Sequence, residues 1–253
     1  MKVVLNHRLS ARENLSELYA EAKELKRKRE RIVFAMEELK SKIARLEAEA
    51  EAEAALKPVV RVKSSRKREW FEAFRWMYSS SGLLVVGGRD ARQNELLVGR
   101  HLEDGDLFFH ANVHGAPAVV LKRGQSASEG DLLETAGFAA VFSSAWKAGH
   151  GVADVYCVKP DQVSKYSHGE YVAKGGFMIK GERKWFKGIA LRLRLTVVGE
   201  RVAVVPWSGE GVGVVPGGSR KSAVAEAVKK KLAFGSLDEV VSLLPQGDCE
   251  LSR

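Results

Sequence analysis

The sequence predicts an α+β protein in which a long N-terminal coiled-coil helix is followed by a compact mixed, largely antiparallel sheet domain with flanking helices. Two patterns predict this class. Apolar residues recur at alternating spacings of three and four between Leu15 and Ala50, interrupted only at Arg29. Beyond residue 80, short apolar runs alternate with turn signals and helical segments. Because 45% of the 253 residues are hydrophobic, the chain can bury a sizeable core.

The N-terminal segment, residues 1–57, is predicted to contain a helix over 11–56. Ser10 and Glu13 match a capping box at its start, and Pro58 follows its end. One helix cannot bury a heptad stripe against itself, so we expect a homodimer or a separate helix partner. Packing of the helix on its own globular domain is the alternative. The residues of the stripe are Leu15, Leu18, Ala22, Leu25, Ile32, Met36, Leu39, Ile43, Leu46 and Ala50.

The segment that enters the globular region carries the densest positive charge of the chain. Residues 58–78 hold six basic and two acidic residues. Within this segment, 64–78 is predicted to be a capped helix whose core-facing side carries Trp70, Phe74 and Met77. Three consecutive basic side chains precede these aromatic residues and are candidates for phosphate contacts: Arg66, Lys67 and Arg68.

Beyond this segment the sequence alternates predicted strands and helices, with a polar tail at the end. The runs with strand character are 82–88, 106–111, 118–123, 152–158, 176–180, 189–198, 201–206 and 212–215. The helical segments are 94–102, 128–148 and 219–234, and 237–244 adds a last short helix.

The strand-to-helix turn at 87–95 is a candidate phosphate site. Two glycines lie between a predicted strand and a helix, where free backbone N–H groups and the helix dipole favour an anion. Its side chains Arg89, Gln93 and Asn94 are candidate nucleic-acid contacts. A structural turn in which Asp90 caps the helix is an equal alternative.

Two histidines, His110 and His114, are four residues apart. On a strand, residues i and i+4 point to the same side, so both imidazoles can line one surface and donate to phosphate, ribose or base edges. The segment has neither the helical geometry nor the glutamate of a zinc protease motif, so no metal is predicted. Structural histidines bonded within the fold are the alternative. In the polar loop 163–171, Lys165 is a further candidate phosphate contact.

The composition limits the possible partners and compartments. A net charge of +9 and a pI near 9.5 favour a polyanion but do not choose between RNA, DNA and a membrane surface. Cys157 and Cys249 lie far apart and are interpreted as a core thiol and a tail thiol in a reducing compartment. No spanning or secretory segment is recognisable, so the sequence predicts a cytoplasmic protein without a cofactor.

Four segments, 66–76, 87–95, 106–116 and 163–181, occur in an order that resembles the NFACT-R domain of the NEMF-like ribosome quality-control factors, a family also called fibronectin-binding protein A-like. The upstream helix and the Val-Val-Pro-Gly-Gly sequence resemble archaeal members. This resemblance implies three parts, which are a coiled-coil helix (1–57), an NFACT-R-like RNA-binding domain (58–187) and a strand and helix extension packed on that domain (188–253).

The resemblance implies a protein that binds tRNA and the large ribosomal subunit and has no catalysis of its own. Full-length family members carry an NFACT-N domain and a helix-hairpin-helix domain before a coiled-coil hairpin. We expect the present sequence to lack these modules, and with them the tRNA-dependent tail elongation of the family. Two other functions remain open. One is a coiled-coil scaffold, and the other is an RNA-processing or tRNA-modifying enzyme using Asp90, Glu95, Asp106, His110 and His114.

Overall fold

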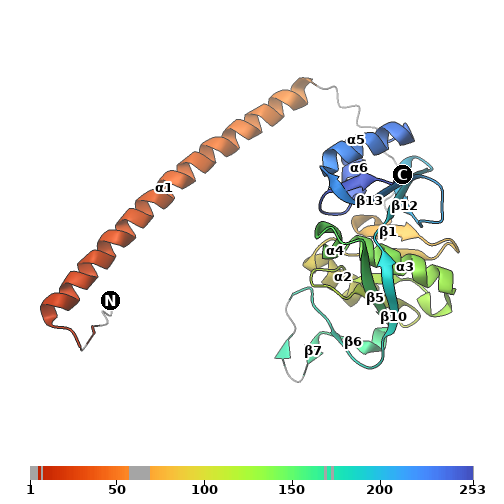
Figure 1. The fold of residues 1–253 in the computed structure, drawn as a ribbon, viewed down its shortest axis with the longest axis horizontal. Helices are drawn as coiled ribbons and strands as arrows, with labels where there is room; N and C mark the ends of the chain where they lie inside the picture. Colours follow the sequence, from red (N-terminus) through yellow and green to blue (C-terminus); the bar gives the residue numbers. More distant parts are fainter. Residues whose placement is uncertain (1–4, 7, 57–68, 168–169, 172–173, 253) are drawn as a thin grey trace. The chain divides into compact units, whose positions relative to one another are not determined.

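The computed structural model describes residues 5–6, 8–56, 69–167, 170–171 and 174–252, and the chain divides into two units, Met1–Arg66 and Lys67–Arg253. The first unit contains α1, Ala11–Leu56, with the predicted bounds (Figure 1). The Ser10 N–H donates to the Glu13 carboxylate at 2.7 Å, and the Glu13 N–H donates to Ser10 Oγ at 3.3 Å. The predicted capping box is therefore confirmed.

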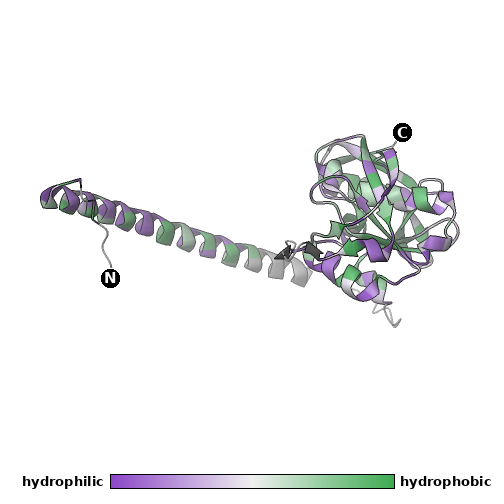
Figure 2. Cartoon of the chain, turned by 90° about the horizontal axis from the view of Figure 1, so that it is seen from below, coloured by the Kyte–Doolittle hydropathy of each residue, from purple (hydrophilic) through white to green (hydrophobic). Residues whose placement is uncertain are grey.

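The helix α1 exposes its apolar stripe. Leu25, Ile32, Leu39 and Ile43 are each more than half exposed, and hydrophobic residues recur among hydrophilic ones along the helix (Figure 2). An isolated helix of this kind gains most of its stability from packing its apolar face against a partner. The coiled coil itself stays a prediction.

The second unit contains a six-stranded sheet of order β1-β2-β4-β3-β5-β10 and a four-stranded sheet of order β12-β11-β13-β14. All pairs between the described strands are antiparallel, which confirms the predicted fold class. The first sheet consists of β1 (Arg75–Tyr78), β2 (Leu84–Gly87), β3 (Leu107–Ala111), β4 (Val119–Leu121), β5 (Val152–Val158) and β10 (Lys184–Ala190). The second consists of β11 (Leu193–Val198), β12 (Arg201–Val205), β13 (Val212–Ser219) and β14 (Cys249–Leu251).

Among its described residues, the second unit also contains two short ladders and five α-helices. The ladders pair β6 (Val163–Ser164) with β9 (Met178–Ile179) and β7 (Tyr166–Ser167) with β8 (Glu170–Tyr171). The helices are α2 (Ala91–His101), α3 (Glu129–Val141), α4 (Ser144–Lys147), α5 (Lys221–Leu232) and α6 (Leu237–Leu243).

The six-stranded sheet is covered on both faces. Phe109 of β3 joins the large cluster that contains α3 and the second sheet, whereas its neighbour Phe108 packs with Val98 of α2 and with Phe177. Successive side chains of a strand point to opposite faces, so a nearly continuous apolar strand serves both layers. The helix α2 therefore lies on the face opposite α3.

The predicted helix over 64–78 is wrong in its described part. Residues Trp70–Ala73 form a single 3₁₀ turn, and Arg75–Tyr78 form β1, which pairs with β2. Phe74 and Met77 are buried as predicted, but they belong to different clusters on the two faces of the sheet, whereas Trp70 is exposed. Pairing with a neighbouring strand outweighed the local helical spacing.

Three further predictions need correction. The helix predicted over 128–148 is two helices, because Ser143 caps a new one, and the strand over 189–198 divides into β10 and β11. The expected polar tail contains β14, where Cys249 is fully buried, so it is a second core thiol. Burial raises the pKa of Cys157 to about 11 and raises that of Cys249 too. The boundary at 187/188 lies within β10, and the division into three parts stays a prediction.

The first turn of α3 is held by a capping box between Ser128 and Asp131. The Asp131 carboxylate accepts from the Ser128 N–H at 3.0 Å and from its Oγ at 2.6 Å. Burial opposes ionisation of Asp131, but the hydrogen bonds from Ser128, Ser79 and Ser81 outweigh burial and hold the pKa of Asp131 well below its usual value. The ionised carboxylate is therefore the form that the fold stabilises.

Replacing Asp131 with asparagine is expected to lower the free energy of unfolding by about 1–2 kcal/mol at pH 7. A depressed carboxyl pKa stabilises the fold above the unfolded-state pKa, and this stability is lost as the pH falls towards the folded-state pKa. The difference between wild type and variant should shrink from pH 7 to pH 3 in urea unfolding. Asp104→Asn, at an exposed position, is the control; an Asp131→Asn deficit as large at pH 3 as at pH 7 contradicts the explanation.

Candidate nucleic-acid interface

Three strands of the six-stranded sheet bring polar residues to one edge. Both β2 and β3 pair antiparallel with β4, so they run parallel to each other and end at the same edge. The strand β1 begins there, because Arg75 pairs with Gly87. A pocket of about 460 Å³ lies at this edge, beside the start of α2. We call it the edge pocket; its charged and imidazole side chains are Arg75, Arg89, Asp90, His110, His114 and Lys174.

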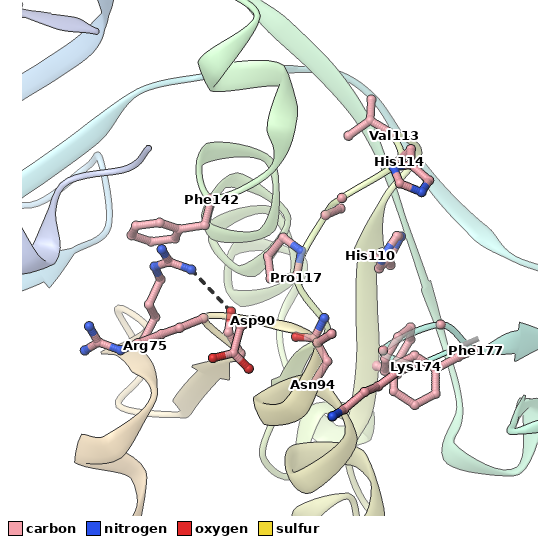
Figure 3. A pocket seen from close by; sticks show the side chains of 18 of the residues that line it. Arg75, Asp90, Asn94, His110, Val113, His114, Pro117, Phe142, Lys174 and Phe177 are labelled. Atoms are coloured by element: carbon pink, nitrogen blue, oxygen red, sulfur yellow. Dashed lines mark hydrogen bonds between the residues drawn. The ribbon is translucent and has the colours of Figure 1, made fainter. Parts of the chain in front are cut away.

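One side of the edge pocket carries two guanidinium groups. Arg75 Nη1 donates to the Gly88 carbonyl at 3.3 Å, drawn as a dashed line in Figure 3, and Arg75 Cζ lies 4.6 Å from the centre of the Phe142 ring. Burial, and then the charge of Arg89, lower the pKa of Arg75 to about 10, so it remains protonated at neutral pH. Arg89 Nη2 donates to the Phe74 carbonyl at 3.2 Å. This side of the pocket is therefore positively charged.

In the turn between β2 and α2, Asp90 caps the helix, which is one of the two alternatives that the sequence left open. Asp90 accepts from the Gln93 N–H at 2.8 Å, and Gln93 Oε1 accepts from the Arg89 N–H at 3.0 Å. Asn94 is 7% exposed, and its Oδ1 accepts from the Ala118 N–H at 3.1 Å, which ties α2 to the residue before β4. Asp90 is confirmed as the cap, whereas a phosphate at this turn stays a prediction.

The other side of the edge pocket carries the two histidines (Figure 3). His110 lies in β3, and His114 lies beyond the end of the strand, so a turn and not strand periodicity brings both to one pocket. Burial lowers the pKa of His110, although hydrogen bonds with the backbone of Ala111 and Ala116 act in the opposite direction. The His110 ring is consequently neutral at pH 7, while the side chain of His114 is exposed.

A third wall comes from residues 174–177, which Glu95 of α2 holds in place. The Glu95 carboxylate pairs with Lys165 and accepts from the Gly175 N–H at 3.2 Å. The hydrogen bond from Lys165, followed by that from Gly175, lowers the pKa of Glu95. This ionised carboxylate fixes the wall against α2 and brings Lys174 and Phe177 to the pocket (Figure 3).

The edge pocket unites four of the nine residues predicted as nucleic-acid contacts: Arg89, Asn94, His110 and His114. The side chain of Gln93 accepts from the Arg89 N–H, Lys165 pairs with Glu95, and neither lines the pocket. Arg66, Lys67 and Arg68 lie outside the described residues. Sequence reasoning missed the pocket residues Arg75, Lys174 and Phe177. The Lys-Gly-Gly-Phe sequence was the available signal, because a basic residue beside two glycines allows close approach of a ligand to the backbone.

Of the acidic residues considered for an enzyme, Asp90 lines the edge pocket with the two histidines, but as the cap of α2 it already accepts from the Gln93 N–H. Asp106 pairs with Lys122 at 2.7 Å, Glu95 pairs with Lys165, and neither lines the edge pocket. Among the residues that the structure describes, no group of three His, Cys, Asp or Glu side chains is placed to hold a metal ion. In the same part of the chain, no helix has the length and apolarity needed to cross a membrane.

Comparison with known proteins defines the class to which this fold and pocket belong. Residues 73–181 match the family model described as NFACT protein RNA binding domain, so this region, which includes the edge pocket except for Gln246, is an RNA-binding domain.

Three relatives then identify the family. The chain is 34% identical over 205 residues to the archaeal Rqc2 homolog aRqcH of Methanocaldococcus jannaschii, with 76% of this chain covered. It is 39% identical to the ribosome quality control complex subunit NEMF homolog of Drosophila melanogaster and to the subunit NEMF of Homo sapiens, with 60% and 50% covered. The chain belongs to the NEMF-like family of ribosome quality-control factors. It spans 30%, 16% and 12% of the lengths of these relatives.

Proposed function

We propose that this chain binds tRNA and the large ribosomal subunit in the cytoplasm and catalyses no reaction. The observation that supports this most directly is the edge pocket, which lies in the RNA-binding domain and brings Arg75, Arg89 and Lys174 together beside two histidines. Guanidinium and ammonium groups bind phosphate oxygens, and imidazole and amide groups bind ribose and base edges. The names of the relatives place them in ribosome quality control, which favours tRNA and ribosomal RNA as the ligands.

The contacts divide into two sets in this proposal. Arg66, Lys67, Arg68, Arg89 and Lys174 contact phosphates, and Gln93, Asn94, His110 and His114 provide polar contacts. Lys165 joins the first set only if a phosphate replaces Glu95 as the partner of its ammonium group. In this proposal the basic side chains supply most of the affinity, and the polar side chains orient the RNA.

Binding dominated by phosphate contacts is expected to weaken with salt. Raising KCl from 50 to 200 mM should reduce the affinity for tRNA roughly 500-fold, because about five phosphates release their counterions. Fluorescence anisotropy of labelled tRNA with the full chain measures this slope. An affinity that is the same at both salt concentrations removes the electrostatic basis of the proposal.

A triple charge reversal locates the contribution of the entry segment. Replacing Arg66, Lys67 and Arg68 with glutamate should weaken tRNA binding and flatten the salt dependence. The matched control is the same reversal of Lys229, Lys230 and Lys231, an equally basic run in the last turn of α5. If both triple variants lose the same affinity for tRNA, net charge rather than the entry segment attracts the RNA.

The absence of catalysis is tested on the same RNA. Incubating tRNA with the chain, with and without Mg²⁺ or Mn²⁺, should leave both its length and its nucleoside composition unchanged. Cleavage or a new nucleoside that His110→Ala abolishes would establish the enzyme alternative instead.

The exposed stripe of α1 supports a second part of the proposal, which is a helix partner supplied by another copy of the chain or by another protein. The full chain is expected to form a dimer in light scattering, and a chain without residues 1–57 is expected to be a monomer. Replacing Ile32 and Leu39 with lysine should have the same effect without deleting the helix. A helix-deleted chain that stays dimeric contradicts assembly through α1.

A further inference from the structure

The edge pocket has the size of a small-molecule site. Its volume of about 460 Å³ falls within the range of roughly 300–1,000 Å³ that is typical of ligand pockets. Paired RNA is contacted mostly across its exposed phosphates and 2′-hydroxyls, whereas sequence-specific recognition takes unstacked bases out of single-stranded regions. A pocket of this size is therefore more suited to one unpaired unit than to a duplex.

The cationic end of the pocket indicates an anionic ligand. Arg75 and Arg89 come together with a single carboxylate, that of Asp90, among the described residues that line the pocket. Arg75 Nε is buried and has no hydrogen-bond partner in the part of the chain that the structure describes. A third cation is near, because burial and then the charge of Arg75 lower the pKa of Lys221, the first residue of α5. A phosphate group would compensate this excess positive charge.

The opposite end of the pocket offers aromatic faces. His110, Phe177 and Tyr156 line it, and Figure 3 shows His110 and Phe177 across the pocket from Arg75, with Asn94 between the two ends. The rings are fixed by one another. The Phe108 ring is parallel to that of His110, with 6.3 Å between the ring centres. The Phe177 ring meets the Phe108 ring edge-on, with 5.8 Å between the centres. Rigid aromatic faces beside a positive groove are how proteins stack single bases.

The geometry points to a binding site for one nucleoside monophosphate unit, with its phosphate at Arg75 and Arg89 and its base against His110 and Phe177. This inference rests on the proposed function, because the unit is supplied by an unpaired nucleotide of a bound RNA. A free nucleotide has the same chemistry and is separated from the RNA source by the experiment below. Asn94 holds the floor of the site through its bond to the Ala118 N–H.

Three RNA hairpins, each closed by a linker without bases in place of the loop, test the site in the full chain: one fully paired, one with a single bulged adenosine, and one with an abasic residue at the bulge. The bulged hairpin is expected to bind on the order of 10-fold more tightly than the other two, because only it presents a base for stacking. With 2-aminopurine at the bulge, binding should quench the fluorescence of the base. The variant Phe177→Leu should abolish both effects, so that it binds the three hairpins equally.

Two matched variants distinguish binding at this site from attraction by overall positive charge. Arg89→Gln should reduce the preference for the bulge, whereas Lys230→Gln on the exposed end of α5 should leave it intact. Adenosine monophosphate and inorganic phosphate are then compared as competitors for binding of the bulged hairpin. Competition by the nucleotide at a lower concentration than phosphate supports the site, and a bulge preference in addition identifies RNA as the source. Competition without that preference identifies free nucleotide as the source.

Two results overturn the inference. Equal competition by inorganic phosphate and nucleotide would reduce the pocket to a simple anion site. Equal binding of the three hairpins, together with no competition by the nucleotide, would exclude the nucleotide site while leaving RNA binding by the chain established. If none of the hairpins and no tRNA binds, the proposed function itself fails, so the two failures are distinguishable.

Discussion

Replacing Phe109 with alanine is expected to lower the free energy of unfolding of the Lys67–Arg253 unit by about 3–5 kcal/mol. Phe109 is fully buried in β3, between β4 and β5, and its ring lies 5.9 Å from that of Phe186 on β10. Its removal leaves a cavity between the sheet and α3. Because a domain is commonly stable by about 5–15 kcal/mol, the variant should lose a large share of its stability in urea unfolding followed by tryptophan fluorescence.

The same substitution at Phe234 is the matched control. Phe234 follows α5 and is 38% exposed, so the same atoms are removed from a partly solvated position. The expected loss at Phe234 is below about 1 kcal/mol. If the two variants lose equal stability, β3 does not lie at the centre of the core.

Replacing Gly175 with alanine is expected to reduce tRNA affinity roughly 30- to 100-fold, because it removes the Lys174 and Phe177 contacts together. Gly175 has a φ of +82°, and an added Cβ would lie 2.5 Å from Ala91 Cβ and 2.7 Å from Ala91 Cα. Residues 174–177 must then move away from α2, and the hydrogen bond from the Gly175 N–H to Glu95 is lost. The affinity is measured by anisotropy, and the melting temperature should fall by only a few degrees.

Gly149→Ala separates backbone strain from the steric clash. Gly149 has a φ of +73°, and nothing lies within 4 Å of a Cβ added there. This variant should show the strain of a left-handed alanine, about 1 kcal/mol, and bind tRNA as the wild type does. Equal affinities of the Gly175→Ala and wild-type chains would exclude residues 174–177 from the RNA-binding surface.

The elements that local patterns specify were predictable. The heptad stripe with its capping box defined α1, and apolar runs between glycine-rich turns located most strands of both sheets. The segment from Trp70 to Tyr78 shows the limit of such reasoning. Its apolar spacing favours a helix, yet β1 forms there because the pairing with β2 satisfies its backbone and buries Phe74 and Met77 on separate faces.

The edge pocket was predictable only in part, because some of its residues reach it through contacts between distant segments of the chain. Arg89, Asn94, His110 and His114 stand close to recognisable turns, so their polar character could be interpreted from the sequence. Arg75 reaches the pocket through the pairing of β1 with β2, and Lys174 and Phe177 reach it through contacts of Gly175 with Glu95, 80 positions earlier in the chain. Such contacts depend on tertiary structure, which residue spacing does not contain.

Glu95 has a double role, because its one carboxylate bonds to two segments of the chain. Lys165 and Gly175 both bond to the Glu95 carboxylate, so the chain is attached to α2 at both of these residues. Lengthening a segment whose ends are already tethered costs only about 0.6 kcal/mol per doubling of its length. An insertion between Lys165 and Gly175 is therefore expected to cost little stability while both ends stay bonded to Glu95.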